Sequence, residues 1–162
     1  MTELFVSWSD YHRTIERLAG RLYDAGWPFD RIVALGRGGL RVGDCLSRLY
    51  RKPLAVMQAA RGEDGVVAVS QHLAALEPAL GGRVLLVDDL VDSGATLASA
   101  MHGLQGRCTE LRTAVLWLRE GAALRPDYHV QTLARDCRLH RPTEPYDFTT
   151  IDDLARRVRA SS

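Results

Sequence analysis

Three aspartates follow a run of aliphatic residues near the middle of the chain. Asp88 and Asp89 come directly after residues 84–87, and Asp92 comes three residues later. Four consecutive β-prone aliphatics predict a strand buried on both faces of a parallel sheet, and ligands of such sheets bind just beyond the carboxyl ends of the strands. We therefore expect Asp88 and Asp89 at the mouth of a site, where carboxylates can accept hydrogen bonds from sugar hydroxyls.

A loop of small residues follows the acids, and it is made of Ser93, Gly94, Ala95 and Thr96. Its successive backbone N–H groups precede a predicted helix, whose N-terminus favours an anion. Gly94 permits close approach of a phosphate, and the hydroxyls of Ser93 and Thr96 add donors. Ser93 could also be a plain helix N-cap, which is compatible because capping and anion binding use the same amides. Carboxylates that can bind sugar hydroxyls lie a few residues from amides that can bind a phosphate. Together they indicate a site for a phosphorylated sugar.

The whole segment from Asp88 to Thr96, DDLVDSGAT, resembles the 5-phosphoribosyl 1-pyrophosphate (PRPP) binding motif of the type I phosphoribosyltransferases. That motif has two acids, two apolar residues and then Asp-Ser/Thr-Gly-x-Thr. The resemblance implies PRPP as the donor substrate, with residues 92–96 around its 5′-phosphate. It also implies that Asp88 and Asp89 bind the ribose 2′- and 3′-hydroxyls, directly or through a metal-bound water. For Asp89 alone, capping of the loop is the alternative.

Asp92 is the residue that the resemblance connects with the acceptor base. Family members that act on 6-oxopurines carry aspartate at this position, whereas adenine-specific members carry alanine. The resemblance therefore implies guanine, xanthine or hypoxanthine as the base, with Asp92 accepting or holding the N7 proton as N9 becomes the nucleophile. An aspartate that merely caps the following helix is the competing interpretation.

Residues 36–39, Gly-Arg-Gly-Gly, form a glycine-rich turn about 50 residues before the PRPP motif. They resemble the family's pyrophosphate loop, in which a strained peptide before the arginine directs amides at the leaving group. The resemblance implies that Arg37, Gly38 and Gly39 bind pyrophosphate, with Arg37 countering the charge that develops on it.

Phosphoribosyl transfer ionises the bond between the anomeric carbon and pyrophosphate, so charge placement is the main catalytic tool. The negative field of Asp88 and Asp89 favours an oxocarbenium-like transition state. Mg²⁺ is implied as the cofactor, because it bridges diphosphate oxygens while keeping several waters. Asp88 and Asp89 are its candidate protein ligands, directly or through water.

The resemblance extends over most of the chain to the bacterial xanthine-guanine phosphoribosyltransferases, and it includes Val6-Ser7-Trp8 near the beginning. Near the end, residues 144–147 resemble the last part of the hood that covers the purine. The chain departs from the family at two base contacts. Arg119 stands where the family reads O6 with lysine, and His140 or Arg141 stands where the family stacks tryptophan on the base.

These correspondences make Arg119, His140, Arg141 and Tyr146 the candidate base-binding residues. Arginine can donate hydrogen bonds to O6, and histidine or arginine can stack on a base. The alternatives are a solvated loop arginine for Arg119, a surface histidine for His140 and hood packing for Tyr146.

Composition places the chain among ordinary globular proteins. Its 162 residues fit a single phosphoribosyltransferase domain, 1–162, with a net charge of +1 and 46% hydrophobic residues. The lack of a basic stripe speaks against nucleic acid as a partner, and the aliphatic stretches are too short for a membrane span. The N-terminus has no basic leader, and the three cysteines are widely separated, which argues against a disulfide framework or a zinc site. We expect a cytoplasmic protein.

Strand and helix patterns alternate along the chain and predict an α/β fold, a parallel doubly wound sheet with a flexible flap and a small C-terminal hood. The flap is expected at about 58–80, with a hairpin-like turn at residues 62–65, and the hood at about 128–162, ending in a short helix. The predicted helices are 10–25, 40–49 and 97–104, and the predicted strands are 32–35, 53–57, 83–87 and 113–118.

The sequence therefore predicts a Mg²⁺-dependent enzyme of purine salvage, which transfers phosphoribose from PRPP to N9 of a 6-oxopurine and releases pyrophosphate. Two alternatives remain open at this point. One is a PRPP- or nucleotide-binding regulator on the same fold, and the other is a phosphoribosyltransferase for a non-purine heterocycle. A homo-oligomer, dimer or tetramer, is expected from the family alone.

Overall fold

The computed structural model describes residues 2–61, 67–69 and 80–161. The chain divides into two compact units, one of residues 14–135 and one made of both chain ends, residues 1–13 and 136–162. Each unit has its own sheet, six-stranded in the larger unit and two-stranded in the other. The predicted single-domain organisation stays a prediction.

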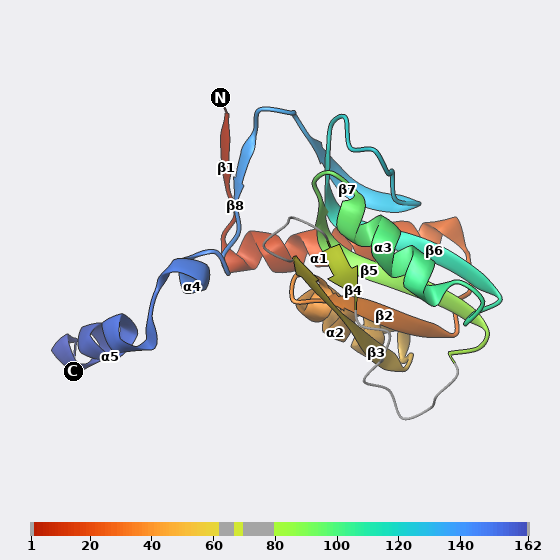
Figure 1. Cartoon of the computed structure of the whole chain (residues 1–162), viewed down its shortest axis with the longest axis horizontal. Coiled ribbons are helices and arrows are strands. Elements are labelled where there is room, and N and C mark those ends of the chain that lie inside the picture. The colour runs from red at the N-terminus through yellow and green to blue at the C-terminus, as the bar shows by residue number, and fades with distance from the viewer. Residues whose placement is uncertain (1, 62–66, 70–79, 162) are drawn as a thin grey trace. The chain divides into compact units, whose positions relative to one another are not determined.

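A six-stranded sheet in the order β4-β3-β2-β5-β6-β7 is the centre of the larger unit (Figure 1). All neighbouring strands are parallel except β3 and β4, which pair antiparallel at one edge. The predicted parallel α/β fold is therefore confirmed. The strands are β2 (Arg31–Gly36), β3 (Leu54–Arg61), β4 (Val67–Val69), β5 (Arg83–Val91), β6 (Glu110–Arg119) and β7 (Tyr128–Leu133).

Two helices cross over between parallel strands in opposite directions. From β2 the chain passes through α2 (Gly39–Tyr50) to β3 on one side, and from β5 it passes through α3 (Ala95–Leu104) to β6 on the other. Right-handed crossovers in opposite directions place their helices on opposite faces of a sheet. The direction in which the chain adds strands to the sheet therefore reverses between β2 and β5. In such sheets the ligand binds outside the carboxyl ends of the strands at this switch point.

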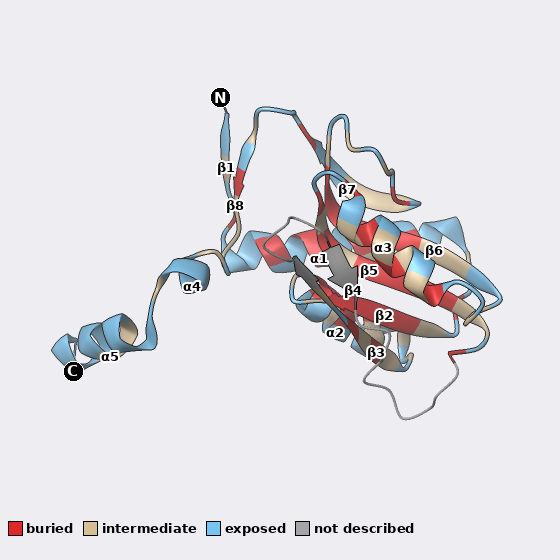
Figure 2. Ribbon diagram, viewed as in Figure 1, coloured by how far each residue is buried: buried red, intermediate tan, exposed pale blue. Residues whose placement is uncertain are grey.

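The central strands are buried on both faces, as continuous aliphatic runs predict for a covered parallel sheet. Residues 32–35 of β2 and 84–87 of β5 are all buried, and they appear as red segments in Figure 2. On one face, strand side chains such as Val33 and Leu86 form a core cluster with Leu97 and Leu104 of α3. This packing fixes the strand ends that carry the candidate site.

Local signals mark the ends of α1 (Trp8–Ala25) as expected. The hydroxyl of Ser7 accepts a hydrogen bond from the amide of Asp10 at 3.1 Å, which satisfies an amide of the first turn. Gly26 follows the helix with φ of +64°, the left-handed conformation that favours glycine after a helix.

Two boundaries differ from the sequence-based expectation. Strand β5 does not end at the acids but continues to Val91, because Asp88 and Val91 pair in register with Val115 and Leu118 of β6. Residues 128–133, expected at the start of the hood, form β7 at the edge of the main sheet, beside β6.

The flap expectation falls only partly within the described residues. Ala59 pairs with Val69 and Arg61 with Val67, so β3 and β4 form the antiparallel pair expected of a hairpin. The predicted turn at residues 62–65 and most of the rest of the predicted flap lie outside the described residues.

The unit of both chain ends holds a small parallel pair of strands that the sequence patterns did not reveal. Strand β1 (Glu3–Phe5) pairs with β8 (Arg138–His140), and two helices follow, α4 (Pro145–Phe148) and α5 (Ile151–Ala160). Helix α5 is the predicted terminal helix. None of the helices within the described ranges has the length and apolar character needed to cross a membrane.

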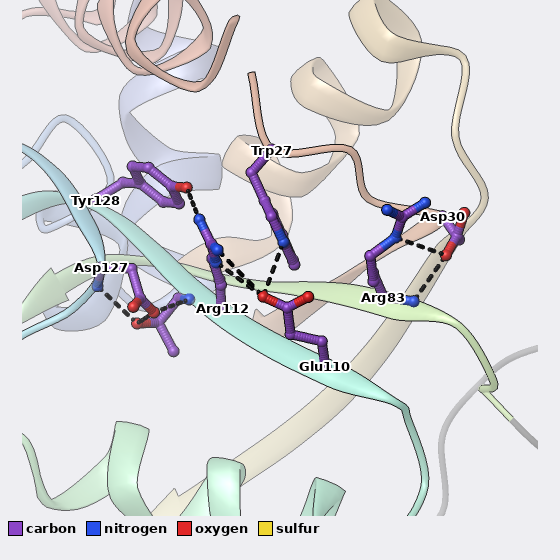
Figure 3. A network of polar contacts seen from close by, with 8 residues as sticks. Trp27, Asp30, Arg83, Glu110, Arg112, Asp127 and Tyr128 are labelled. Atoms are coloured by element: carbon purple, nitrogen blue, oxygen red, sulfur yellow. Dashed lines mark hydrogen bonds and ion pairs between the residues drawn. The ribbon is translucent and has the colours of Figure 1, made fainter. Parts of the chain in front are cut away.

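A polar network ties together the amino ends of the strands, at the edge opposite the switch-point site (Figure 3). Arg112 of β6 donates to the hydroxyl of Tyr128 at 2.8 Å and to Glu110 at 3.2 Å, and its guanidinium lies 4.6 Å from the centre of the Trp27 ring. Glu110 also accepts a hydrogen bond from the Trp27 indole at 2.9 Å. The network joins β6 to β7 and to the chain segment after α1.

We expect Arg112→Ala to lower the free energy of unfolding measurably, because it removes a cation–π contact and charge-assisted hydrogen bonds at one position. The matched control is Arg48→Ala, since Arg48 pairs with exposed Asp44 one helical turn away and its loss should cost less than about 0.5 kcal/mol. Urea unfolding of both variants measures the difference. Equal costs would contradict a stabilising role for the network.

Candidate functional site

The acid pair and the glycine-rich turn lie in direct contact at the switch point. A Cβ atom at Gly38 would overlap the carboxylate of Asp89 and lie 2.8 Å from Oδ1 of Asp88. Gly38 has ordinary helical dihedrals, so it is the space and not the φ angle that requires glycine. Two carboxylates therefore face the turn after β2, and the structure brings together the candidate site residues Asp88, Asp89 and Gly38.

The turn itself follows the end of β2 closely. Gly39 lies against the carbonyl oxygen of Val87, where a Cβ would not fit. The peptide bond between Gly36 and Arg37 is cis, and the Arg37 side chain is exposed. Gly38 is the N-cap of α2 and provides no side-chain cap for the amides of the first turn. Those amides begin a 12-residue helix beside the acids, a position that suits an anion.

The loop after β5 leads into α3 in a similar way. Its N-cap is Gly94, with φ of +93° and no side-chain cap. Ser93, considered above as the N-cap, lies one residue earlier, and its hydroxyl accepts from the amide of Ala95 at 3.3 Å. Asp92 and Ser93 are exposed. The first-turn amides of α3, together with the Ser93 hydroxyl, are thus gathered at the carboxyl end of β5, which is the arrangement that phosphate binding needs.

Asp92 and Arg119 form an ion pair across two neighbouring strand ends. Arg119 is the last residue of β6, and its Nε donates to Oδ1 of Asp92 at 2.6 Å. Its Nη1 donates to the carbonyl oxygen of Ala134, beyond β7, at 3.3 Å. The Arg119 side chain is 18% exposed, against 68% for Asp92. The solvated loop arginine considered above does not describe Arg119, which spans the ends of three strands.

A second loop packs on the phosphate-type loop. The amide of Ala123 donates to the carbonyl oxygen of Ser93 at 3.0 Å. A Cβ at Gly94 would lie 2.8 Å from Cβ of Leu124 and 2.9 Å from its amide nitrogen. The end of β6 therefore holds the side chain of Asp92, through Arg119, and the segment after β6 packs on the backbone of Ser93 and Gly94.

The other base-binding candidates belong to the unit of both chain ends. His140 lies in β8, where its ring stacks on Phe5 with centroids 4.3 Å apart, and its Nδ1 lies 3.0 Å from Oε2 of Glu144. Tyr146 lies in α4 and is 65% exposed, and Arg141 is half-buried just after β8. His140 is thus held by an aromatic and an acidic neighbour. A role of these residues toward a base stays a prediction.

Sequence reasoning did not identify three groups that contact the site. They are the carbonyl of Ala134, the amide of Ala123 and the backbone of Leu124. All three act through the main chain or through bulk alone, so their residue types carry no signal. Gly121, in the same segment after β6, is a partial sequence signal, because glycine there indicates a special backbone conformation. Its φ is +82°, and a Cβ there would overlap the guanidinium of Arg135.

The acid pair suits a hard divalent cation. Asp88 and Asp89 present carboxylate oxygens on one side of the Gly38 turn. No group of three or more His, Cys, Asp or Glu side chains gathers as a cation site among the described residues. Two carboxylates without further protein ligands fit Mg²⁺, which keeps several waters and takes other ligands from substrate phosphates.

Comparison with known proteins places this geometry in a family. Residues 7–138 match the model of the phosphoribosyl transferase domain. The chain belongs to this family. A xanthine-guanine phosphoribosyltransferase of Idiomarina loihiensis is 30% identical over 145 residues, which cover 86% of each chain. The family explains why a glycine-rich turn, an acid pair and a phosphate-type loop meet at one edge of the sheet.

Solved structures repeat the fold of this phosphoribosyltransferase-family chain. A purine phosphoribosyltransferase from Pyrococcus horikoshii superposes with a TM-score of 0.76 at 26% identity, over 88% of this chain and 94% of that one. A Neisseria gonorrhoeae protein with bound ppGpp superposes with a TM-score of 0.71 at 24% identity, over 99% of this chain and 98% of that one. The second likeness concerns the fold alone.

The close packing at Gly94 gives a prediction. Gly94→Ala should destabilise the protein by about 2–4 kcal/mol, because the new methyl group both meets Leu124 and strains a positive φ. Gly106→Ala is the matched control, since Gly106 has φ of +75° with nothing within 4 Å and should cost only about 1 kcal/mol. Urea unfolding compares the two variants, and a cost no larger than that of the control would show that the loop contact is not tight.

Proposed function

We propose that this phosphoribosyltransferase transfers the 5-phosphoribosyl group from PRPP to N9 of a 6-oxopurine, releasing pyrophosphate, as a step of purine salvage. The names of its relatives, which act on xanthine, guanine or purines, support this assignment. The observation that carries it is the ion pair between Asp92 and Arg119 beside the phosphate-type loop.

That ion pair complements the edge of a 6-oxopurine. Such a base presents a donor, N7–H, next to an acceptor, O6. Asp92 is an acceptor and Arg119 a donor, and the two are joined at 2.6 Å across the ends of β5 and β6. In adenine the 6-amino group would place a donor against the guanidinium, which disfavours that base. The neighbouring pair thus selects for an oxygen at position 6.

Asp92 also has the chemistry of a general base. As N9 attacks the anomeric carbon, the proton at N7 must be accepted or held, and a carboxylate can do so. Arg119 orients this carboxylate, because it is less exposed than Asp92 and is anchored to Ala134. Their contact is partly screened by solvent, so its importance lies more in geometry than in stability.

The donor side of the site would hold PRPP at three points. The amides after β5 and the hydroxyls of Ser93 and Thr96 suit the 5′-phosphate, and the carboxylates of Asp88 and Asp89 suit the ribose hydroxyls. Arg37, Gly38 and Gly39, with the first-turn amides of α2, suit the pyrophosphate. Bound Mg²⁺ would supply charge neutralisation of the diphosphate. The acids beside the turn would then favour the positive charge that grows on the ribose.

A base panel with PRPP and Mg²⁺ tests the proposal by following pyrophosphate release. We expect turnover with guanine, xanthine or hypoxanthine, little with adenine, and a loss of about 10²-fold or more in kcat for Asp92→Asn, because the amide cannot accept the N7 proton. Turnover confined to adenine or to a non-purine base would contradict the assignment. Measurable affinity for PRPP or guanine nucleotides without any turnover would instead favour a regulator on the same fold.

Arg119→Lys should raise KM for the base about tenfold and leave KM for PRPP unchanged. Lysine can reach either Asp92 or the Ala134 carbonyl, but its single ammonium lacks the planar fork that contacts both. Arg125→Lys, an exchange at an exposed position in the loop after β6, is the control and should change neither constant. Steady-state kinetics with each substrate varied gives the answer, and an equal rise in both KM values would argue against a base-specific role.

A further inference from the structure

Residues 120–124, directly after β6, form a turn that the backbone itself holds in shape. The amide of Ala122 donates to the carbonyl oxygen of Arg119 at 3.2 Å, which closes the turn on the last residue of β6. Gly121 has φ of +82°, as the third residue of a type II turn requires. This post-β6 turn is therefore a firm support for whatever packs on it.

The post-β6 turn orients one peptide group of the phosphate-type loop after β5. The amide of Ala123 donates to the carbonyl oxygen of Ser93 at 3.0 Å. The peptide bond between Ser93 and Gly94 is trans, and in a trans peptide the C=O and N–H bonds point in opposite directions. The N–H of Gly94 belongs to this same peptide group. It therefore points away from the turn, on the side where a ligand oxygen can accept it.

The side chain of Leu124 covers Gly94. A Cβ atom at Gly94 would lie 2.8 Å from Cβ of Leu124, and Gly94 is buried although its neighbours Ser93 and Ala95 are exposed. Leu124 is half-buried, and it also packs against the core cluster that contains Leu97 of α3. Leu124 therefore lies between the phosphate-type loop and the core, where it holds the left-handed conformation of Gly94, with φ of +93°.

That conformation matters because phosphate-type loops bind through several backbone N–H groups at once. A residue in the left-handed conformation turns successive N–H groups toward one concave site, and an anion binds there. A loop that already has this shape does not lose conformational freedom when the anion binds, so its affinity is higher. Contacts behind the loop can thus control binding without touching the ligand.

We propose that Leu124 is a positioning residue for phosphate binding, since its side chain holds Gly94 in the shape from which the loop amides bind the 5′-phosphate of PRPP. The inference rests on the proposed function for the identity of this ligand. Leu124 acts on the backbone of the phosphate-type loop, whereas the proposed reading of the base uses Asp92 and Arg119. Its effect should therefore appear in the affinity for the phosphorylated sugar and not in the affinity for the base.

Isothermal titration calorimetry with ribose 5-phosphate tests the role of Leu124, because this probe contains neither pyrophosphate nor a base. Leu124→Ala should raise Kd about tenfold, since the shorter side chain leaves Gly94 uncovered. Leu124→Met, which keeps the apolar bulk, should restore most of the affinity. Leu111→Ala is the matched control. Leu111 is also half-buried against the same core cluster, but it lies at the amino end of β6, so Kd should not change.

Steady-state kinetics separates positioning from a general loss of stability. In Leu124→Ala the KM for PRPP should rise by a similar factor, while kcat and the KM for the base stay within about twofold of the wild type. An unchanged Kd in Leu124→Ala would overturn the proposal, and so would an equal loss of affinity in Leu111→Ala. A wild-type protein that does not bind ribose 5-phosphate at millimolar concentration would overturn it as well.

Failure of the proposed function is a different result. It would appear as a wild-type protein that binds ribose 5-phosphate but releases no pyrophosphate from PRPP with any base. The titrations of Leu124→Ala, Leu124→Met and Leu111→Ala would then still decide whether Leu124 positions the loop.

Discussion

The contact between Gly38 and the two carboxylates is the constraint on which the site depends. At the switch point, the turn after β2 and the end of β5 come so close that no side chain fits between them. The glycine-rich turn and the two carboxylates can contact one bound molecule together only at such a distance. The buried strands β2 and β5 are parallel and adjacent, and their packing holds that distance. The packing of the core therefore sets the geometry of the candidate site.

The extension of β5 changes how the acids are held. The sequence suggested acids in a loop just after a strand, but Asp88 and Asp89 lie within the strand itself, which pairs with β6 up to Leu118. Asp88 is therefore held by its pairing with Val115 in the sheet, and the amide of Asp89 donates to Oδ1 of Asp88 at 2.9 Å. The pattern missed this because charged residues are rare in central strands, and only the pairing with β6 overrides their low propensity.

The residues proposed to bind PRPP could be picked out from the sequence, because phosphate and sugar binding use local chemistry. The glycines, the acids and the small hydroxyl residues are contiguous in two short segments, and their types carry the signal. The contacts of the proposed base site could not be predicted to the same degree. Arg119 meets Asp92 only because β6 lies beside β5, and its second anchor is a main-chain carbonyl that any residue would provide. Similarly, β1 and β8 are too short to show a periodic pattern, and each is a strand because it pairs with the other.

The parallel pairing of β1 with β8 makes the two ends of the chain a single structural element. Residues 1–13 and 136–162 belong to one unit although more than a hundred positions separate them in sequence. Removing the chain after residue 135 would therefore leave β1 without the strand that satisfies its backbone, and the damage would appear at the N-terminus. For the same reason, a fusion partner at either end of the chain is attached to the same small unit. An internal position in the larger unit is the better place for a probe that must leave both ends intact.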